Sequence, residues 1–163
     1  ETSVGKFPAL VVHTMASIIE EAEKHYWPHI ETKRPRAVQR SSVFQSDVIC
    51  FNACRVAEEI QAKGIVGMTT SGYTAYKVSS FRPKAKIFIF SDSPSMLNTL
   101  NLLWGVQCFY YNGFSSTDET IDDCMQILCE SGYVSPGDTL INTGSMPLHK
   151  RLRTNMLKIT TVE

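Results

Sequence analysis

The sequence predicts an α/β fold: a three-layer α/β/α sandwich around a five-stranded, mostly parallel sheet whose last strand is antiparallel at an edge. Short apolar runs alternate with segments of helical periodicity, which is the pattern of parallel strands connected by helices. The final connection shows no helical pattern, so the fifth strand is more easily placed antiparallel. The chain has 163 residues, of which 43% are hydrophobic, so it can form one domain with its own core.

The N-terminal part predicts two helices separated by a surface segment. The first begins near Pro8 and runs to about Trp27, with an apolar stripe that must pack against something. Positions 28–40 are rich in charge and proline and predict a loop or arm, whose basic side chains we interpret as solvated rather than as a binding patch. Ser46 is the expected N-cap of a second, mostly apolar helix, which stops at Gly64 and lies in the core.

The segment from Gly64 to Pro83 predicts the strand, turn and helix around which the remaining elements are organised. An apolar run from Ile65 to about Thr69 is too short for a helix and favours a strand. A hydroxyl-rich turn follows, and then a helix from Tyr73 to Ser80. Such a turn directs backbone N–H groups and a helix N-terminus at one small volume, where an anion would be stabilised.

The second half of the chain continues this alternation. Its segment from Lys86 to Ser91 is a continuous apolar run bounded by polar residues, which is typical of a strand buried on both faces. Ser115 to Glu119 have the hydroxyl and acid placement of a helix start. The expected strands lie at 86–91, 104–110, 138–143 and 156–162, and the expected helices at 93–101 and from 115 to about 129.

Composition and charge speak against several classes of function. Sixteen basic and sixteen acidic residues cancel, so the chain lacks the field that nucleic-acid binders use, and we expect no nucleic-acid partner. No run approaches the roughly 18 apolar residues of a membrane span, and the first residues do not resemble a signal peptide. We therefore expect a cytoplasmic protein without a membrane partner.

Cysteine and histidine do not indicate a metal site. The five cysteines are an odd count without a C-x-x-C pair, and we expect reduced, partly buried thiols. His25 and His29 have metal-like spacing, but Pro28 ends the helix that would align them. We expect no metal ligands and no cofactor in this chain.

Two sets of polar groups at strand ends form a candidate ligand site. No nucleophile, base and acid stand out as a set, so the residues indicate a binding or regulatory domain without catalytic residues. The turn and the loop at 144–153 follow strands that can be neighbours, so both would border one crevice suited to a phosphorylated metabolite. The alternative is a capped helix beside a solvated basic loop. The candidate residues are Thr69, Thr70, Ser71, Gly72, Tyr73, Thr74, Gly144, Ser145, Lys150, Arg151 and Arg153.

Several segments resemble the C-terminal domain of pyruvate kinases. They are, in chain order, ETSVGKFP, AKGIVGMTTSGYTAYKVSSFRPKAKIFIFS, LLWGV, GDTLINTGSMP and RTNMLKI, and together they reach over nearly all of the sequence. The resemblance implies a single C-terminal domain at 1–163, with positions 1–7 as the remnant of a junction to a catalytic barrel. Because Glu1 begins inside the junction motif, a truncated chain is favoured over a free-standing phosphometabolite-binding module.

The resemblance also implies a function for the parent enzyme. It would transfer a phosphoryl group from phosphoenolpyruvate to ADP in glycolysis with Mg²⁺ and K⁺, and this chain alone would be inactive. The family's domain contributes to a homotetramer and holds an allosteric pocket for a phosphorylated effector, here a sugar phosphate or a nucleotide-type molecule. A purely structural interaction domain with an empty pocket is a further alternative.

Two departures from the family pattern affect the ligand. Thr70 stands where a lysine is common in the sugar-phosphate-sensitive animal type, and GSMPLHKRLRT replaces a glycine-rich stretch. Lys150, Arg151 and Arg153 can restore the lost positive charge. The last strand, LKITTV, either pairs with its twin in an oligomer or lies exposed to water as an edge strand.

Overall fold

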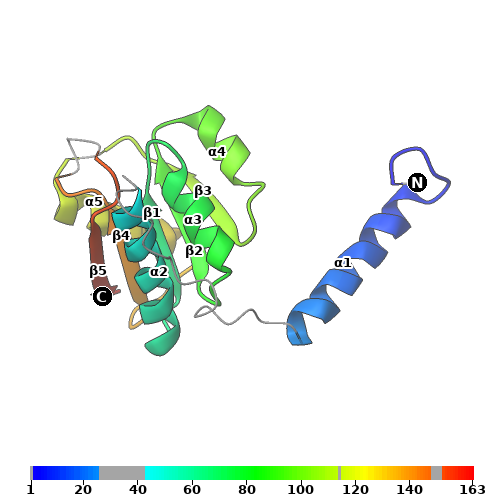
Figure 1. Ribbon diagram of the computed structural model, residues 1–163, viewed down its shortest axis with the longest axis horizontal. Coiled ribbons are helices and arrows are strands. Elements are labelled where there is room, and N and C mark those ends of the chain that lie inside the picture. Colours follow the sequence, from blue (N-terminus) through cyan, green and yellow to red (C-terminus); the bar gives the residue numbers. More distant parts are fainter. Residues whose placement is uncertain (1, 26–42, 114, 148–151) are drawn as a thin grey trace.

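The computed structural model describes residues 2–25, 43–113, 115–147 and 152–163. In this part of the chain, five strands form one sheet in the order β3-β2-β1-β4-β5 (Figure 1). The first four strands are parallel, and β5 is antiparallel to β4 at one edge, which confirms the predicted fold class. The strands are β1 (Gly64–Met68), β2 (Lys86–Ser91), β3 (Val106–Tyr110), β4 (Thr139–Gly144) and β5 (Met156–Thr161).

Helices cover both faces of the sheet and bury a separate apolar cluster on each. Buried residues of α2, α3 and α4 pack on one face around Ile65, Ile87 and Ile141. Buried residues of α5 pack on the other face around Val66, Phe88 and Leu140. The helices of the described residues are α1 (Pro8–His25), α2 (Phe44–Glu59), α3 (Tyr73–Phe81), α4 (Pro94–Leu100) and α5 (Thr117–Glu130).

The predicted stop of the second helix at Gly64 is wrong. α2 ends at Glu59, and Gly64 is the first residue of β1. A Cβ atom at Gly64 would lie 2.4 Å from Cε2 of the buried Phe88 ring, so the close packing of β1 on β2 requires glycine here. The signal that suggested a helix end therefore reflects a packing constraint in the sheet.

The predicted N-cap at Ser46 is also wrong. The cap position of α2 is Val43, which makes no side-chain capping bond, and Ser46 lies inside the helix. Ser46 is buried, and its hydroxyl donates to the carbonyl oxygen of Thr154 at 3.0 Å. A contact distant in sequence thus replaces the expected local one, while the expected location of this helix in the core is confirmed.

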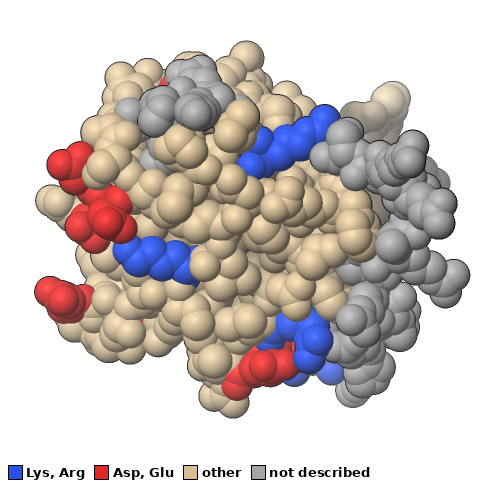
Figure 2. Space-filling model, turned by 60° about the vertical axis from the view of Figure 1, so that its left-hand side comes forward, with Lys and Arg blue, Asp and Glu red and all other residues tan. Residues whose placement is uncertain are grey.

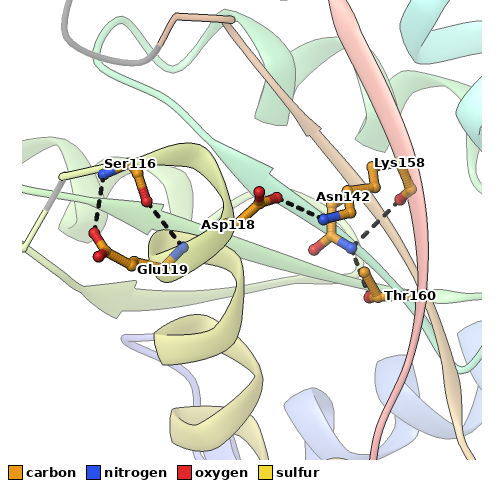
Figure 3. A network of polar contacts seen from close by, with 6 residues as sticks. All are labelled: Ser116, Asp118, Glu119, Asn142, Lys158 and Thr160. Atoms are coloured by element: carbon orange, nitrogen blue, oxygen red, sulfur yellow. Dashed lines mark hydrogen bonds and ion pairs between the residues drawn. The ribbon is translucent and has the colours of Figure 1, made fainter.

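α5 begins where its sequence predicts and is fixed to the β4 and β5 edge of the sheet (Figure 3). The Ser116 hydroxyl accepts from the Glu119 amide, and the Glu119 carboxylate accepts from the Ser116 amide, which forms a capping box. Lys158 Nζ of β5 lies 2.7 Å from Asp118 Oδ1, and Asn142 Nδ2 of β4 donates to Thr160 Oγ1 at 2.8 Å. The ion pair links α5 to β5, and the amide hydrogen bond links β4 to β5.

α1 extends away from the sandwich, and its apolar stripe is exposed in the described structure (Figure 1). Leu10 is 60% and Ile18 is 63% exposed. The expected packing of this face is therefore not found among the described residues. Near its end, Glu23 accepts a hydrogen bond from Trp104 Nε1 at 2.8 Å, and the Arg82 guanidinium lies over the Trp104 ring.

The predicted surface segment at 28–40 and the second half of the His25/His29 pair lie outside the described residues. None of the helices that the structure describes is both long and apolar enough to cross a bilayer.

All five cysteines are free thiols, and burial raises the pKa of Cys50 and Cys124 to about 12. Protonated, buried thiols are poor nucleophiles, which fits a packing role.

Candidate functional site

The candidate site lies at the point where the strand order of the sheet changes direction. From β1 the chain proceeds outward to β2 and β3 on one side, whereas β4 lies on the other side of β1. β1 and β4 are parallel, with Gly67 opposite Thr143, so the turn after β1 and the loop after β4 leave the sheet side by side. Ligands of open α/β sheets bind outside the carboxyl ends of strands at such a point.

The turn after β1 is held by its own hydroxyl groups. Thr69 is buried, its amide bonds to Phe90 of β2, and its hydroxyl accepts from the Gly72 amide at 2.9 Å. Gly72 has a left-handed φ of 77°, which glycine adopts without strain, and it directly precedes α3. Ser71 Oγ accepts from the Tyr73 amide at 3.5 Å, the outer limit for a hydrogen bond, so this amide can turn to a ligand at little cost.

A polar cluster fixes the first residue of α3 to α2. The Tyr73 hydroxyl donates to Asp47 Oδ1, and Lys77 Nζ lies 3.1 Å from Asp47 Oδ2. Burial, followed by the hydrogen bond and charge of Asp47, raises the pKa of Tyr73 to about 12, while the positive charge of Arg153 acts in the opposite direction. The Tyr73 hydroxyl is thus protonated and already engaged, and its role is to orient the turn.

The loop after β4 is closed at its base. Gly144 and Ser145 are buried, and the Gly144 carbonyl accepts from the Asn155 amide at 2.9 Å. The Asn155 side chain accepts from the Met146 amide at 2.6 Å and donates to the Met146 carbonyl at 2.8 Å. Arg153 is exposed, whereas the predicted site residues Lys150 and Arg151 lie outside the described residues.

A buried hydrogen bond joins the helix after the turn to the end of the loop directly. Thr74 Oγ1 of α3 lies 2.7 Å from Thr154 Oγ1 at the end of the loop, and both residues are buried. Of the predicted residues, the structure therefore brings the turn and the described part of the loop together. It adds Asp47, Lys77, Thr154 and Asn155, which sequence reasoning did not place in the site.

On the face drawn in Figure 2, basic and acidic side chains form small separate groups, some of them adjacent, and most of the surface carries neither. Within the described ranges, no group of three or more His, Cys, Asp or Glu residues could hold a metal ion. The turn and the described part of the loop offer hydroxyl groups, backbone amides and the cation of Arg153.

The hydrogen bond between Tyr73 and Asp47 predicts how the stability of the chain changes at alkaline pH. Because the pKa of Tyr73 is raised from 10.0 to about 12, its contribution to stability is present below pH 10 and is lost as the pH rises toward 12. Asp47→Asn should lower the tyrosine pKa in a titration followed by tyrosinate absorbance, and Tyr73→Phe should remove that component. Asp123→Asn is the matched control, because Asp123 accepts from Tyr111 and should shift that residue alone. An unchanged Tyr73 pKa in Asp47→Asn would contradict the described contact.

Comparison with known proteins identifies the family. The family described as pyruvate kinase, alpha/beta domain, matches residues 47–160. Pyruvate kinases of Clostridium acetobutylicum and Staphylococcus aureus are 33% and 32% identical over 100% and 98% of the chain, which spans 34% and 27% of those proteins. A crystal structure of Cryptosporidium parvum pyruvate kinase, 23% identical, covers 100% of the chain with a TM-score of 0.78, and the chain covers 32% of it. The chain belongs to the pyruvate kinase family and carries its alpha/beta, C-terminal domain.

Proposed function

We propose that this chain is the regulatory domain of a pyruvate kinase and that the crevice between the turn at 69–74 and the loop at 144–153 binds a phosphorylated effector. The observation that carries this proposal is the juxtaposition of the two walls at the carboxyl ends of β1 and β4. The ligand class follows from the groups present. Hydroxyls and amides from one wall and the guanidinium of Arg153 from the other suit a phosphate, as in a sugar phosphate or nucleotide.

Near the turn, the described cation that can attract an anion is Arg153 of the last loop, because the charge of Lys77 is balanced. Asp47 neutralises Lys77, so this pair adds little net charge. Thr70 is exposed and uncharged at the position where a lysine is common in some relatives. Arg153 is a described cation whose charge acts on Tyr73, and within the described residues it forms no ion pair with an acidic side chain, so it supports phosphate binding.

The parent enzyme is the second part of the proposal. The chain spans about a third of the length of its curated relatives, and we assign the phosphoryl transfer from phosphoenolpyruvate to ADP to a catalytic barrel elsewhere in the longer protein. The described residues offer no cluster of acids suited to Mg²⁺, so Mg²⁺ and K⁺ would act in that barrel. As a glycolytic enzyme, the parent would work in the cytoplasm.

The isolated chain should therefore show no kinase activity. A steady-state assay with phosphoenolpyruvate, ADP, Mg²⁺ and K⁺ should give no more pyruvate than a protein-free control. Turnover that rises in proportion to the concentration of the chain would contradict the assignment of the chemistry to the barrel.

Effector binding is tested by calorimetric titration with fructose bisphosphate, ribose 5-phosphate, glucose 6-phosphate and AMP. At least one should bind, and Arg153→Ala should weaken its binding by roughly 5- to 150-fold, as expected for a lost charge-assisted contact of about 1 to 3 kcal/mol. Thr70→Lys should strengthen binding, because it adds a cation to the turn.

Lys84→Ala is the matched control for the loss of a cation. Lys84 is exposed and precedes β2, so it lies near the amino ends of the parallel strands, opposite the crevice. The affinity of the Lys84→Ala variant for the effector should equal that of the unmodified chain. Absence of heat and of a thermal shift with all four compounds would refute effector binding.

Oligomerisation is the third part of the proposal, and β5 is the element that supports it. In the described sheet β5 pairs with β4 alone, so its outer edge is open, and Ile159 is 50% exposed. An open edge strand is a template for pairing with a second copy across a two-fold axis. We propose that this edge forms a subunit contact, in a tetramer of the parent enzyme.

Light scattering after size-exclusion chromatography tests this contact. The chain should elute with at least the mass of a dimer, and Ile159→Lys should shift it toward the monomer, because a lysine on an edge strand opposes pairing. Ile18→Lys on α1 is the control, since Ile18 is similarly exposed but lies far from β5 in sequence. A strict monomer at high concentration, or dissociation by Ile18→Lys alone, would exclude the β5 contact.

A further inference from the structure

The adjacent residues Thr154 and Asn155 end the last loop and lead into β5. Neither carries a charge that would attract a phosphate, and the Thr154 side chain is buried. Thr154 nevertheless contacts segments distant in sequence, and Asn155 contacts the start of the same loop. These contacts indicate a role in the site that acts through other residues.

Asn155 joins the two ends of the loop. Its backbone amide and both polar atoms of its side chain bond to Gly144 and Met146, at 2.9, 2.6 and 2.8 Å. The side chain thus satisfies the amide and the carbonyl of Met146 together. The entropic cost of bringing the loop ends together is therefore met by contacts within the protein, before any ligand binds.

Thr154 fixes the closed loop to the two helices beside it. Its hydroxyl lies 2.7 Å from Thr74 Oγ1 in the first turn of α3, and its carbonyl accepts from the Ser46 hydroxyl of α2 at 3.0 Å. Thr74, Thr154 and Ser46 are all less than a tenth exposed. Hydrogen bonds shielded from water in this way give the end of the loop one position relative to the turn.

Arg153 directly precedes this fixed residue. Because Thr154 is bonded to Thr74 at 2.7 Å, the backbone of Arg153 lies next to the first turn of α3, and the direction in which Arg153 moves the pKa of Tyr73 agrees with this placement. The guanidinium is exposed, whereas the backbone next to it is held by Thr154. Orientation of the cation therefore depends on a neighbour that would not contact the ligand.

We propose, on the basis of the proposed function, that Thr154 and Asn155 are positioning residues of the phosphate site. Asn155 closes the loop, Thr154 attaches it to the first turn of α3, and together they hold Arg153 beside the turn before the ligand arrives. Preorganisation of this kind raises affinity because less order has to be created on binding.

The test uses the full 163-residue chain and inorganic phosphate as the probe, with binding followed by NMR titration. Thr154→Val keeps the shape of the side chain and removes the hydroxyl, and it should raise the dissociation constant about fivefold. Thr154→Ser restores the hydroxyl and should return the constant to within about twofold. Asn155→Ala affects an exposed residue, so the fold should persist, and it should also weaken binding, by about threefold.

Thr143→Val is the matched control for loss of a buried threonine hydroxyl. Thr143 lies in β4 and donates to the Val66 carbonyl at 3.1 Å. Among the described residues it forms no hydrogen bond with Thr74 or Asn155. It should lose stability without a change in phosphate affinity. Equal weakening by Thr143→Val and Thr154→Val would show that general destabilisation is the cause, and would overturn the positioning role.

A second measurement separates this inference from the proposed function. In the ligand-free chain, the Arg153 backbone and Nε–H signals should lose order in Thr154→Val and keep it in Thr143→Val. If the unmodified chain binds no phosphate, the proposed function fails, and this measurement still decides whether Thr154 positions Arg153. Unchanged order at Arg153, or unchanged phosphate affinity in both Thr154→Val and Asn155→Ala, would overturn the inference.

Discussion

β1 is buried along its whole length between β2 and β4, and the location of the candidate site follows from this constraint. A parallel strand with both edges paired and both faces covered has room for polar groups only beyond its ends. The turn at Thr69 is the first place after β1 where hydroxyls and backbone amides can face a ligand. The same argument holds for β4, so the two polar segments must meet at the same edge of the sheet.

The packing around β1 also explains which sequence signals were informative. The alternation of apolar runs and helical segments predicted the strands correctly, most directly for β1, β2 and β4, because a short apolar run that is buried on both faces has few alternatives. The predicted helix stop at Gly64 and the predicted N-cap at Ser46 were wrong, because a glycine or serine near a helix end is only a local signal. In the structure Gly64 leaves room for the Phe88 ring, and Ser46 donates to the Thr154 carbonyl; neither contact can be seen in a short window of sequence.

The candidate site shows the same division. The hydroxyl-rich turn and the basic loop were found from their residue types and from their places after two strands. The residues that hold the turn and the loop in place, Thr154, Asn155 and Asp47, were not found. Their residue types are common on any surface, and the partners of Thr154 and Asp47 are far away in sequence. α1 illustrates the limit differently: its amphipathic pattern predicted a helix correctly, but the partner of its apolar stripe is not among the described residues.

The charge beside the turn is balanced by the ion pair between Asp47 and Lys77. Asp47 is partly buried beside the turn, and a carboxylate there would oppose a phosphate if its charge were not balanced. Lys77 supplies this balance at 3.1 Å, and the Tyr73 hydroxyl adds a hydrogen bond to the other carboxylate oxygen. The cost is that Lys77 is no longer available as a ligand. Under the proposed function, attraction for an anion then has to come from the last loop, so the position of Arg153 and the attachment of this loop through Thr154 would decide how well a phosphate is held.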